Sequence, residues 1–520
     1  MTTPLYKRSD THLRRAEYFQ AEGLPCHALE ELDYAVAASP KEAEPLISRA
    51  DCLRRQDRFA DAESDLCRAI ALAPGNPEPC VMMAQVLAAM RREGEGLVFL
   101  ERAEALDPSW HRIYLIRGDI EMALGRLTRA VESYRRAVDL SPRNIESLAI
   151  LAGALVDAGQ IREAASTAAS ILKIAPNNAD ARFVRAVAHL KNGDESKAIL
   201  ELNRAVRLAP DHSKIRTERG CLMLRIDRFD DAFHDLARAV EIEPENRRAL
   251  CALGEAAWRT GRVREAIEAY GRAIAVGAAG SEVFLGRAEA LALAGRREEA
   301  VEDCARALRA DPGNPDIHAA RGVFNMEIGR YDDAMRDLNQ AIALDGDLVE
   351  AILARGELRS RQGDASGSTA DFAAAVRLNP DEPDLVARWI RSVGDAGDAV
   401  TALKLIKREI PAHPNSISLL LLKADLLAES GLAAEAQQAY RDVVELFPGE
   451  VEPHLRLAEF CESRREFAKA LVEYDQALRI DPGDSFTRLM RAALLHQMGR
   501  SDDARSERRV ASDLRRWHGR

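Results

Sequence analysis

The chain has 520 residues, too many for one ordinary hydrophobic core, so it requires several domains or an array of repeats. Hydrophobic residues make up 47% and aromatic residues only 5%, and the abundance of alanine, leucine, arginine and glutamate favours helix over strand. The formal net charge of −11 argues against non-specific binding to nucleic acid, which needs a basic surface.

The eight cysteines are scattered without a C-x-x-C pair, which is typical of free thiols in a reducing compartment. Met1 to Asp10 has no apolar core of the kind found in signal peptides. The chain also lacks the uninterrupted apolar run of about 18 residues that a membrane span needs. We therefore expect a cytoplasmic protein that does not bind membranes.

Prolines recur with a fixed period from one end of the chain to the other. Every interval between them is 34 residues or a multiple of 34, and the two vacant positions hold Ala278 and Gly346. The series is Pro40, Pro74, Pro108, Pro142, Pro176, Pro210, Pro244, Pro312, Pro380, Pro414, Pro448 and Pro482. Such a phase is the signature of a repeat protein.

Three small residues keep the same phase. The first stands at Ala16, the second at Ala28 and the third at Ala35, and each recurs through most of the chain. A glycine such as Gly125 often lies between the first two, where it can end a helix with a positive φ. The second and third are seven residues apart, hence on one helical face, and the proline ends the unit. Each unit is therefore predicted to be a helical hairpin with a narrow seam.

This skeleton resembles that of the tetratricopeptide repeat family, and the resemblance covers residues 9–518. It implies an all-α, right-handed α-solenoid superhelix of antiparallel helical hairpins. We expect a leader at 1–8, fourteen units over 9–484, and a capping unit with a basic second helix at 485–520. The fifteen units begin at Ser9, Ala43, Pro77, His111, Ile145, Ala179, Ser213, Arg247, Ser281, Pro315, Val349, Pro383, Ile417, Val451 and Ser485.

No phosphate-binding loop, catalytic motif or cluster of metal ligands is present, so we expect no enzyme, cofactor or metal. The leading hypothesis is a scaffold that binds an extended or helical segment of a partner protein in its concave groove. A regulatory or substrate-presenting arm for a separate enzyme is the alternative, and a coat of stacked solenoids is a third. The sequence leaves the oligomeric state open.

By resemblance, groove residues stand at unit positions 2, 5, 6, 9, 12 and 13. Units three to six are apolar there, and mid-helix acids follow from the eighth unit onward. The apolar set is Met82, Ile116, Met122, Ile150, Val156, Val184, Val187 and Leu190. The acidic set is Glu255, Glu289, Glu357, Asp425 and Glu459. Each set has an alternative interpretation. The residues at position 12 would pack into the core, and the acids would form a solvated face. The apolar set predicts that charges at Ile116, Ile150 and Val184 abolish binding and leave helicity intact.

The eleventh and twelfth units depart from the small-residue pattern. Ser368 follows Gly367 in the second small slot, and Ile390 and Glu409 fill the first and third slots of the next unit. Because contacts between neighbouring repeats stabilise a solenoid, local opening is predicted to be easiest at residues 364–411.

Arginine stands at position 7 of nine units, and eight of these arginines are followed by an acid sixteen residues later. Arg117 is the exception, and Glu473 is the one such acid in a unit without the arginine. We predict a bridge, often bidentate, between the two helices of each unit. The alternative is that the arginine and the acid each face solvent independently and do not pair. The predicted pairs are Arg15–Glu31, Arg49–Asp65, Arg185–Glu201, Arg219–Asp235, Arg287–Asp303, Arg321–Asp337, Arg355–Asp371 and Arg491–Glu507.

The second helix of the fifteenth unit is basic, with arginine in a slot that is apolar or aromatic in most other units. Its arginines are Arg505, Arg508, Arg509, Arg515 and Arg516. Two interpretations stand: a polar cover for the last repeat, or a basic docking tail.

Overall fold

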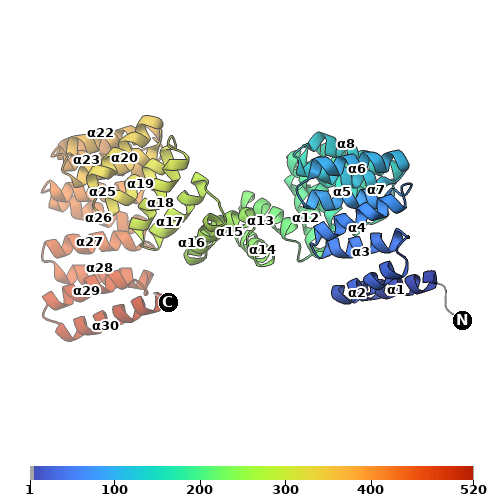
Figure 1. Ribbon diagram of the computed structural model, residues 1–520. Helices are drawn as coiled ribbons and strands as arrows, with labels where there is room; N and C mark the ends of the chain where they lie inside the picture. Colours follow the sequence, from blue (N-terminus) through green and yellow to red (C-terminus); the bar gives the residue numbers. More distant parts are fainter. Residues whose placement is uncertain (1–4, 519–520) are drawn as a thin grey trace. The chain divides into compact units, whose positions relative to one another are not determined.

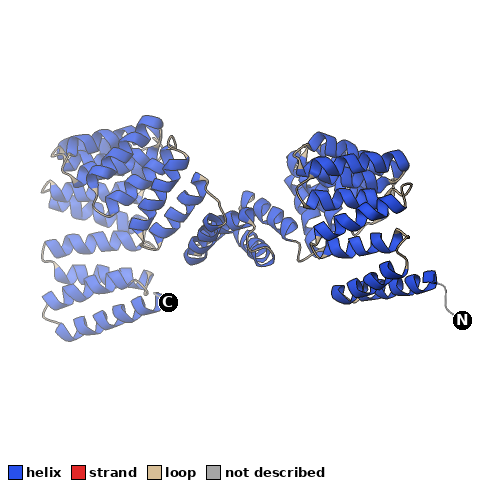
Figure 2. Cartoon of the chain, in the orientation of Figure 1, coloured by secondary structure: helices blue, strands red, loops and turns tan. Residues whose placement is uncertain are grey.

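The computed structural model describes residues 5–518, and the side chains of residues 9–514. Every regular element in this part of the chain is an α-helix, and short turns join the helices (Figure 2). The chain divides into two compact bodies, Met1–Thr260 and Gly261–Arg520. The all-α prediction is confirmed.

The first body contains helices α1 to α15, stacked as successive hairpins (Figure 1). They are α1 Leu5–Ala21, α2 Pro25–Ala38, α3 Glu44–Arg55, α4 Phe59–Leu72, α5 Glu78–Ala89, α6 Glu93–Leu106, α7 His111–Ala123, α8 Leu127–Leu140, α9 Ile145–Asp157, α10 Ile161–Ile174, α11 Ala179–Lys191, α12 Glu195–Leu208, α13 Ser213–Arg225, α14 Phe229–Ile242 and α15 Arg247–Arg259. Residues of the predicted leader from Leu5 onward belong to α1, and residues 1–4 lie outside the described part.

The second body contains helices α16 to α30. They are α16 Val263–Ala275, α17 Ser281–Leu293, α18 Arg297–Ala310, α19 Pro315–Glu327, α20 Tyr331–Leu344, α21 Val349–Arg361, α22 Ala365–Leu378, α23 Pro383–Asp395, α24 Ala399–Glu409, α25 Ile417–Glu429, α26 Ala433–Leu446, α27 Val451–Ser463, α28 Phe467–Ile480, α29 Ser485–Gln497 and α30 Ser501–His518. The predicted right-handed winding of the complete array stays a prediction.

One backbone position ends the first helix of each hairpin in the left-handed region. Glycine supplies it in most units, for example Gly125 with a φ of 70°. Where the sequence has no glycine there, Asp57, Arg91, Asp227 and Arg465 adopt φ values between 57° and 62°. The repeat geometry thus imposes a positive φ even on non-glycine residues, which rarely adopt it.

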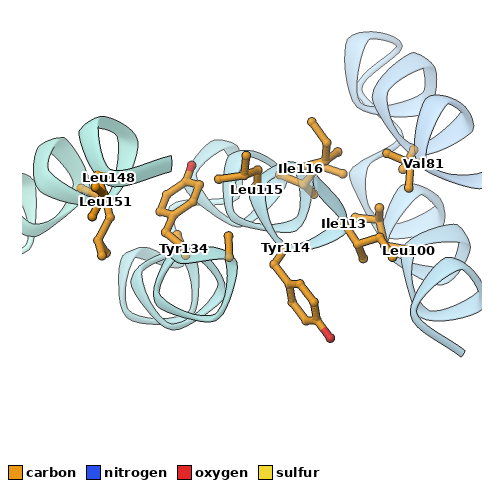
Figure 3. Close-up of a cluster of buried hydrophobic side chains, with 14 of the residues drawn as sticks. Val81, Leu100, Ile113, Tyr114, Leu115, Ile116, Tyr134, Leu148 and Leu151 are labelled. Carbon is orange, nitrogen blue, oxygen red and sulfur yellow. The ribbon is translucent and has the colours of Figure 1, made fainter. Parts of the chain in front are cut away.

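The small residues form the seam that their periodicity predicts. A Cβ added to Gly118 would lie 2.3 Å from the ring of Tyr134, and one added to Gly220 would lie 2.5 Å from Leu236. The first helix must therefore carry almost no side chain where the second helix inserts a large one. Figure 3 shows two side chains of second helices, Tyr134 of α8 and Leu100 of α6, beside Ile113 of α7 in the core that joins consecutive hairpins of the first body.

The odd-numbered helices form one layer of the first body and the even-numbered helices α2 to α14 form the other. Five of the seven consecutive pairs of odd helices contact each other directly, as α3 does α5 and α9 does α11, whereas no comparable contact joins two even helices among the described residues. Helices on the inner side of a curved stack lie closer together than those on the outer side. The odd helices therefore line the concave face of the first body.

The last hairpin consists of α29 and α30, and α30 carries the five arginines noted in the sequence. Arg508 and Arg509 are exposed, and Arg505 pairs with Asp502 at 2.7 Å on the same helix. The side chains of Arg515 and Arg516 lie outside the described residues. The exposed arginines of α30 agree with a polar cover on the last repeat.

Candidate functional site

The eight predicted apolar residues lie on the odd helices α5, α7, α9 and α11 and divide into two groups. Met82, Ile116 and Val184 are buried, at 6%, 9% and 6% exposure, and belong to the core of the first body. Charges at Ile116 and Val184 would disrupt this core. A test that is meant to leave helicity intact therefore has to place its charges at more exposed positions. The other five are partly exposed and pack against the same core: Met122, Ile150, Val156, Val187 and Leu190.

We call these five residues the aliphatic floor. Gly153 lies between Ile150 and Val156 on α9, and a Cβ added there would have no atom within 4 Å. Glycine in the middle of a helix lowers helix stability by about 0.5–1 kcal/mol relative to alanine. The space above Gly153 is therefore open, and no described neighbour lies close enough to require a glycine at this position.

The predicted acids of the second body are mostly paired with arginines. Arg388 on α23 bonds Glu357 on α21 at 2.6 Å, and Arg456 on α27 lies 3.6 Å from Glu459. Glu289 is half-buried on α17. These pairs cross from one repeat to the next or follow one helical turn, so the acidic series from Glu357 to Glu459 is largely neutralised. In the first body, Glu255 is exposed on α15.

Asp425 is the most strongly held of these acids and is 8% exposed. Its carboxylate accepts hydrogen bonds from the Tyr440 hydroxyl at 2.5 Å, from Arg391 at 2.8 Å, and from Arg456. Burial and the Asp425 carboxylate raise the pKa of Tyr440. Three successive odd helices, α23, α25 and α27, thus meet at one carboxylate, which makes this cluster structural.

A cavity of about 280 Å³ opens between α1, α3, α5 and α7, a feature that the sequence did not predict. Asp51 in its wall bonds both Arg54 at 2.7 Å and Arg55 at 2.8 Å. The carboxylates of Glu17, Glu44 and Glu78 have no ion-pair partner among the described side chains. The wall is Leu13, Ala16, Glu17, Gln20, Leu32, Glu44, Ile47, Ser48, Asp51, Arg54, Arg55, Glu78, Met82 and Arg112. We call this site the acidic cavity.

Two lysines lie beyond the aliphatic floor, in the direction away from the acidic cavity. Lys191 ends α11, and Lys214 stands in the first turn of α13 with its Nζ 5.4 Å from the ring centroid of Phe183. Both side chains are exposed, and neither forms an ion pair in the part of the chain that the structure describes. We call Lys191 and Lys214 the cationic edge.

The predicted arginine–carboxylate bridges form in all eight units, with nitrogen–oxygen distances between 2.5 and 3.8 Å. The five aspartates are held in a bidentate way, because both of their oxygens accept from one arginine. The three glutamates bond these arginines through one oxygen. The prediction is confirmed, with the bidentate form limited to aspartate.

The sequence also held a second signal that its interpretation missed. A basic side chain at unit position 4 meets the same acid, nineteen residues later, at distances between 2.5 and 3.5 Å. His454 explains why Glu473 is present in a unit that lacks the arginine. The other pairs are His12–Glu31, Arg182–Glu201, Arg216–Asp235, His318–Asp337 and Arg488–Glu507.

Four of the arginines also reach the second helix of the preceding hairpin. Arg49 bonds Asp33 at 2.7 Å, and Arg355 bonds Asn339 at 2.8 Å. Arg219 and Arg491 do the same with Asn203 and Asp475. These contacts join neighbouring hairpins, so the four arginines stabilise the array.

Residues 5–518 contain no helix long and apolar enough to cross a membrane. Within the described side chains, no group of three or more His, Cys, Asp or Glu residues is placed to hold a metal ion. The aliphatic floor, the acidic cavity and the cationic edge together form the candidate site of the first body.

Comparison with solved structures finds similar helical-repeat chains. YrrB, described as a TPR protein with an unusual peptide-binding site, is 14% identical, and the match covers 36% of this chain and 95% of that one, with a TM-score of 0.32. The APC/C hetero-tetramer Cut9-Hcn1 gives 13% identity, 95% and 96% coverage, and a TM-score of 0.39. Comparison with curated protein sequences finds no match.

Comparison with protein families finds tetratricopeptide repeats along most of the chain. One repeat family matches residues 13–77, 82–145, 151–213, 217–281, 251–315 and 421–485. A second matches residues 121–177 and 291–356. The matches of the first alone cover more than half of the 520 residues, and they agree with the hairpins described above. The chain therefore belongs to the tetratricopeptide repeat family.

Proposed function

We propose that the concave face of the first body holds an extended or helical segment of a partner protein, and that the chain acts as a cytoplasmic scaffold without catalytic activity. The observation that carries the proposal is the aliphatic floor, whose five side chains stay partly exposed around the open position Gly153. Burying such apolar surface is the main favourable contribution to most protein–protein association. The eight free cysteines favour a reducing compartment.

The floor also differs from the other candidate surfaces in being available without rearrangement. The acids at Glu357, Asp425 and Glu459 already bind arginines, so a basic partner would first have to displace those arginines. A partner at the aliphatic floor displaces only water. We therefore assign no leading role to the four predicted acids of the second body, Glu289, Glu357, Asp425 and Glu459.

The test uses peptide display against the full chain, followed by affinity measurement on two kinds of variant. Gly153→Leu fills the open space with a good helix former, so it should keep or raise helix stability while it blocks the floor. Ile150→Glu with Val187→Glu places charge on the floor at positions that are already partly exposed. Leu200→Glu is the matched control, because Leu200 is 56% exposed on the even helix α12.

Selected peptides should bind the wild-type chain and the Leu200→Glu variant equally. They should lose at least tenfold in affinity for Gly153→Leu, with circular dichroism unchanged. Peptides that bind all variants equally would place the site elsewhere and end the proposal.

A further inference from the structure

We infer that the partner segment has a fixed order of charge: basic residues in the acidic cavity, aliphatic residues on the floor, and acidic residues at the cationic edge. This inference rests on the proposed function and adds the chemistry of the partner. All three parts of the surface lie in the first body, and all their residues except Leu32 of α2 stand on the odd helices α1 to α13.

The acidic cavity fits a lysine or arginine side chain. Glu44 and Glu78 stand at its edge, and neither carboxylate has a cationic partner within the described residues. Ile47 and Met82, which are 9% and 6% exposed, supply an apolar wall beside those carboxylates. Lysine and arginine bury an apolar stem and keep a charged head in polar surroundings, which matches a wall of this composition.

Arg112 is the one arginine in the cavity wall without an ion-pair partner among the described side chains, since Arg54 and Arg55 both hold Asp51. Three carboxylates without partners thus face one such arginine. The balance of the open charges is negative, and a basic group of the partner would correct it.

The cationic edge gives the segment its direction. Lys191 and Lys214 carry the unpaired positive charges beyond the floor, because Arg225 on α13 is already bound by Glu195. Of the carboxylates at this edge, Glu195 and Glu218 are bound by Arg225 and Arg248, and Asp180 lies 3.3 Å from His212. Lys191 and Lys214 are thus the charges that carry no ion pair there among the described side chains. At the acidic cavity the acidic side chains of a partner would face Glu17, Glu44 and Glu78. A segment with the reverse charge order therefore faces like charges at both ends.

The spacing of the helices sets the length of the segment. Four steps separate α3 at the acidic cavity from α11 at the cationic edge, through α5, α7 and α9. Packed helices lie about 9 Å apart, so the path is about 36 Å long. An extended chain advances about 3.3 Å per residue, which corresponds to about eleven residues between the basic and the acidic group.

The experiment uses three synthetic peptides that share one central block of alternating leucine and serine, about eleven residues long. The first has two lysines at one end and two glutamates at the other, the second has lysines at both ends, and the third has glutamates at both ends. Binding to the full chain is measured by fluorescence anisotropy at low salt. The lysine–glutamate peptide should bind tightest, and added salt should weaken its binding.

Charge-reversed variants identify which end binds where. Glu44→Lys with Glu78→Lys should weaken the lysine–glutamate peptide about fivefold to thirtyfold, the effect of two exposed ion pairs, and should strengthen the peptide with glutamates at both ends. Lys191→Glu with Lys214→Glu should weaken the lysine–glutamate peptide similarly and strengthen the peptide with lysines at both ends. Glu101→Lys with Glu132→Lys, on the even helices α6 and α8, makes the same change in net charge and should have no effect.

The outcomes separate this inference from the proposed function. If the three peptides bind equally, or if the control variant acts like Glu44→Lys with Glu78→Lys, the charge order is overturned, while a loss of binding in Gly153→Leu still supports the floor. If display-selected peptides also ignore Gly153→Leu, the proposed function fails together with the charge order.

Discussion

The Arg49–Asp65 bridge gives the sharpest test of how the array is stabilised. Both oxygens of Asp65 accept hydrogen bonds from Arg49, from Nε and from Nη2, each at 2.7 Å. The Asp65 side chain is 5% exposed and has no other hydrogen-bond donor in the described structure. Arg49→Leu therefore leaves a buried carboxylate without a partner, which destabilises by about 3–5 kcal/mol when the charge is fully buried. Because the Arg49 side chain is 20% exposed, water can enter, and we expect about 3 kcal/mol.

Arg321→Leu provides an internal comparison at an equivalent position. After that change Asp337 keeps Asn325, whose Nδ2 lies 3.2 Å away, and, when its ring is protonated, the charge of His318, whose Nδ1 lies 3.5 Å away. These remaining partners should reduce the destabilisation to about 1–2 kcal/mol. The difference between the two single variants thus measures what the neighbouring polar groups contribute.

The double variants test whether the stranded charge is the cause of the destabilisation. Removing both charges, as in Arg49→Leu with Asp65→Leu, leaves no buried charge, so it should destabilise less than Arg49→Leu alone. Arg321→Leu with Asp337→Leu should likewise destabilise less than Arg321→Leu alone. An array of repeats does not unfold in two states, so the assay is hydrogen exchange resolved to individual helices. Arg49→Leu should lower the protection of α3 and α4 about a hundredfold. A double variant as unstable as its single variant would refute the reasoning, because the stranded charge would then not be the cause.

The remaining predictions concern the seam and the thiols. Ser368 is 1% exposed, and its hydroxyl has no hydrogen-bond partner in the described structure, so Ser368→Ala should stabilise the second body by about 1 kcal/mol; a measured loss of stability would count against this. Residues 364–411 include the short helix α24, of 11 residues, and should exchange amide hydrogens earlier than α7 to α14 do; equal protection would remove the idea of a weak seam. Burial raises the pKa of Cys304 to about 12, so at pH 8 a thiol reagent should label Cys26 and Cys67, which are exposed, and reach Cys304 only after unfolding or at strongly alkaline pH. Rapid labelling of Cys304 in the folded chain would contradict this.

Features that repeat within one unit were predictable, because their determinants lie close together in the sequence. The turn that Gly125 occupies depends on one backbone conformation, and the small residues depend on the contact between two helices of one hairpin. The Arg321–Asp337 pair was predictable for the same reason, since sixteen residues span one hairpin turn. The nineteen-residue pairs, such as His454–Glu473, held an equal signal that the sequence interpretation did not use.

Contacts between repeats were not predictable in the same way. Asp425 stood in a predicted groove slot, but Arg391 and Arg456 reach it from the repeats on either side. A position within the repeat unit indicates the direction in which a side chain points. It does not indicate the length or charge of the side chains that approach from other hairpins. The sequence therefore did not reveal that arginines pair with Glu357, Asp425 and Glu459.

The sequence by itself determined the all-α hairpin array, its period, its turns and its bridges within hairpins, because each depends on residues at most one unit apart. Only the tertiary structure decided which groove residues are covered. Ile116 and Ile150 occupy the same slot in consecutive units, but Ile116 is buried and Ile150 partly exposed. The acidic cavity likewise exists only where α1, α3, α5 and α7 come together. Burial depends on the volumes of all neighbouring side chains at once, which no single periodic position specifies.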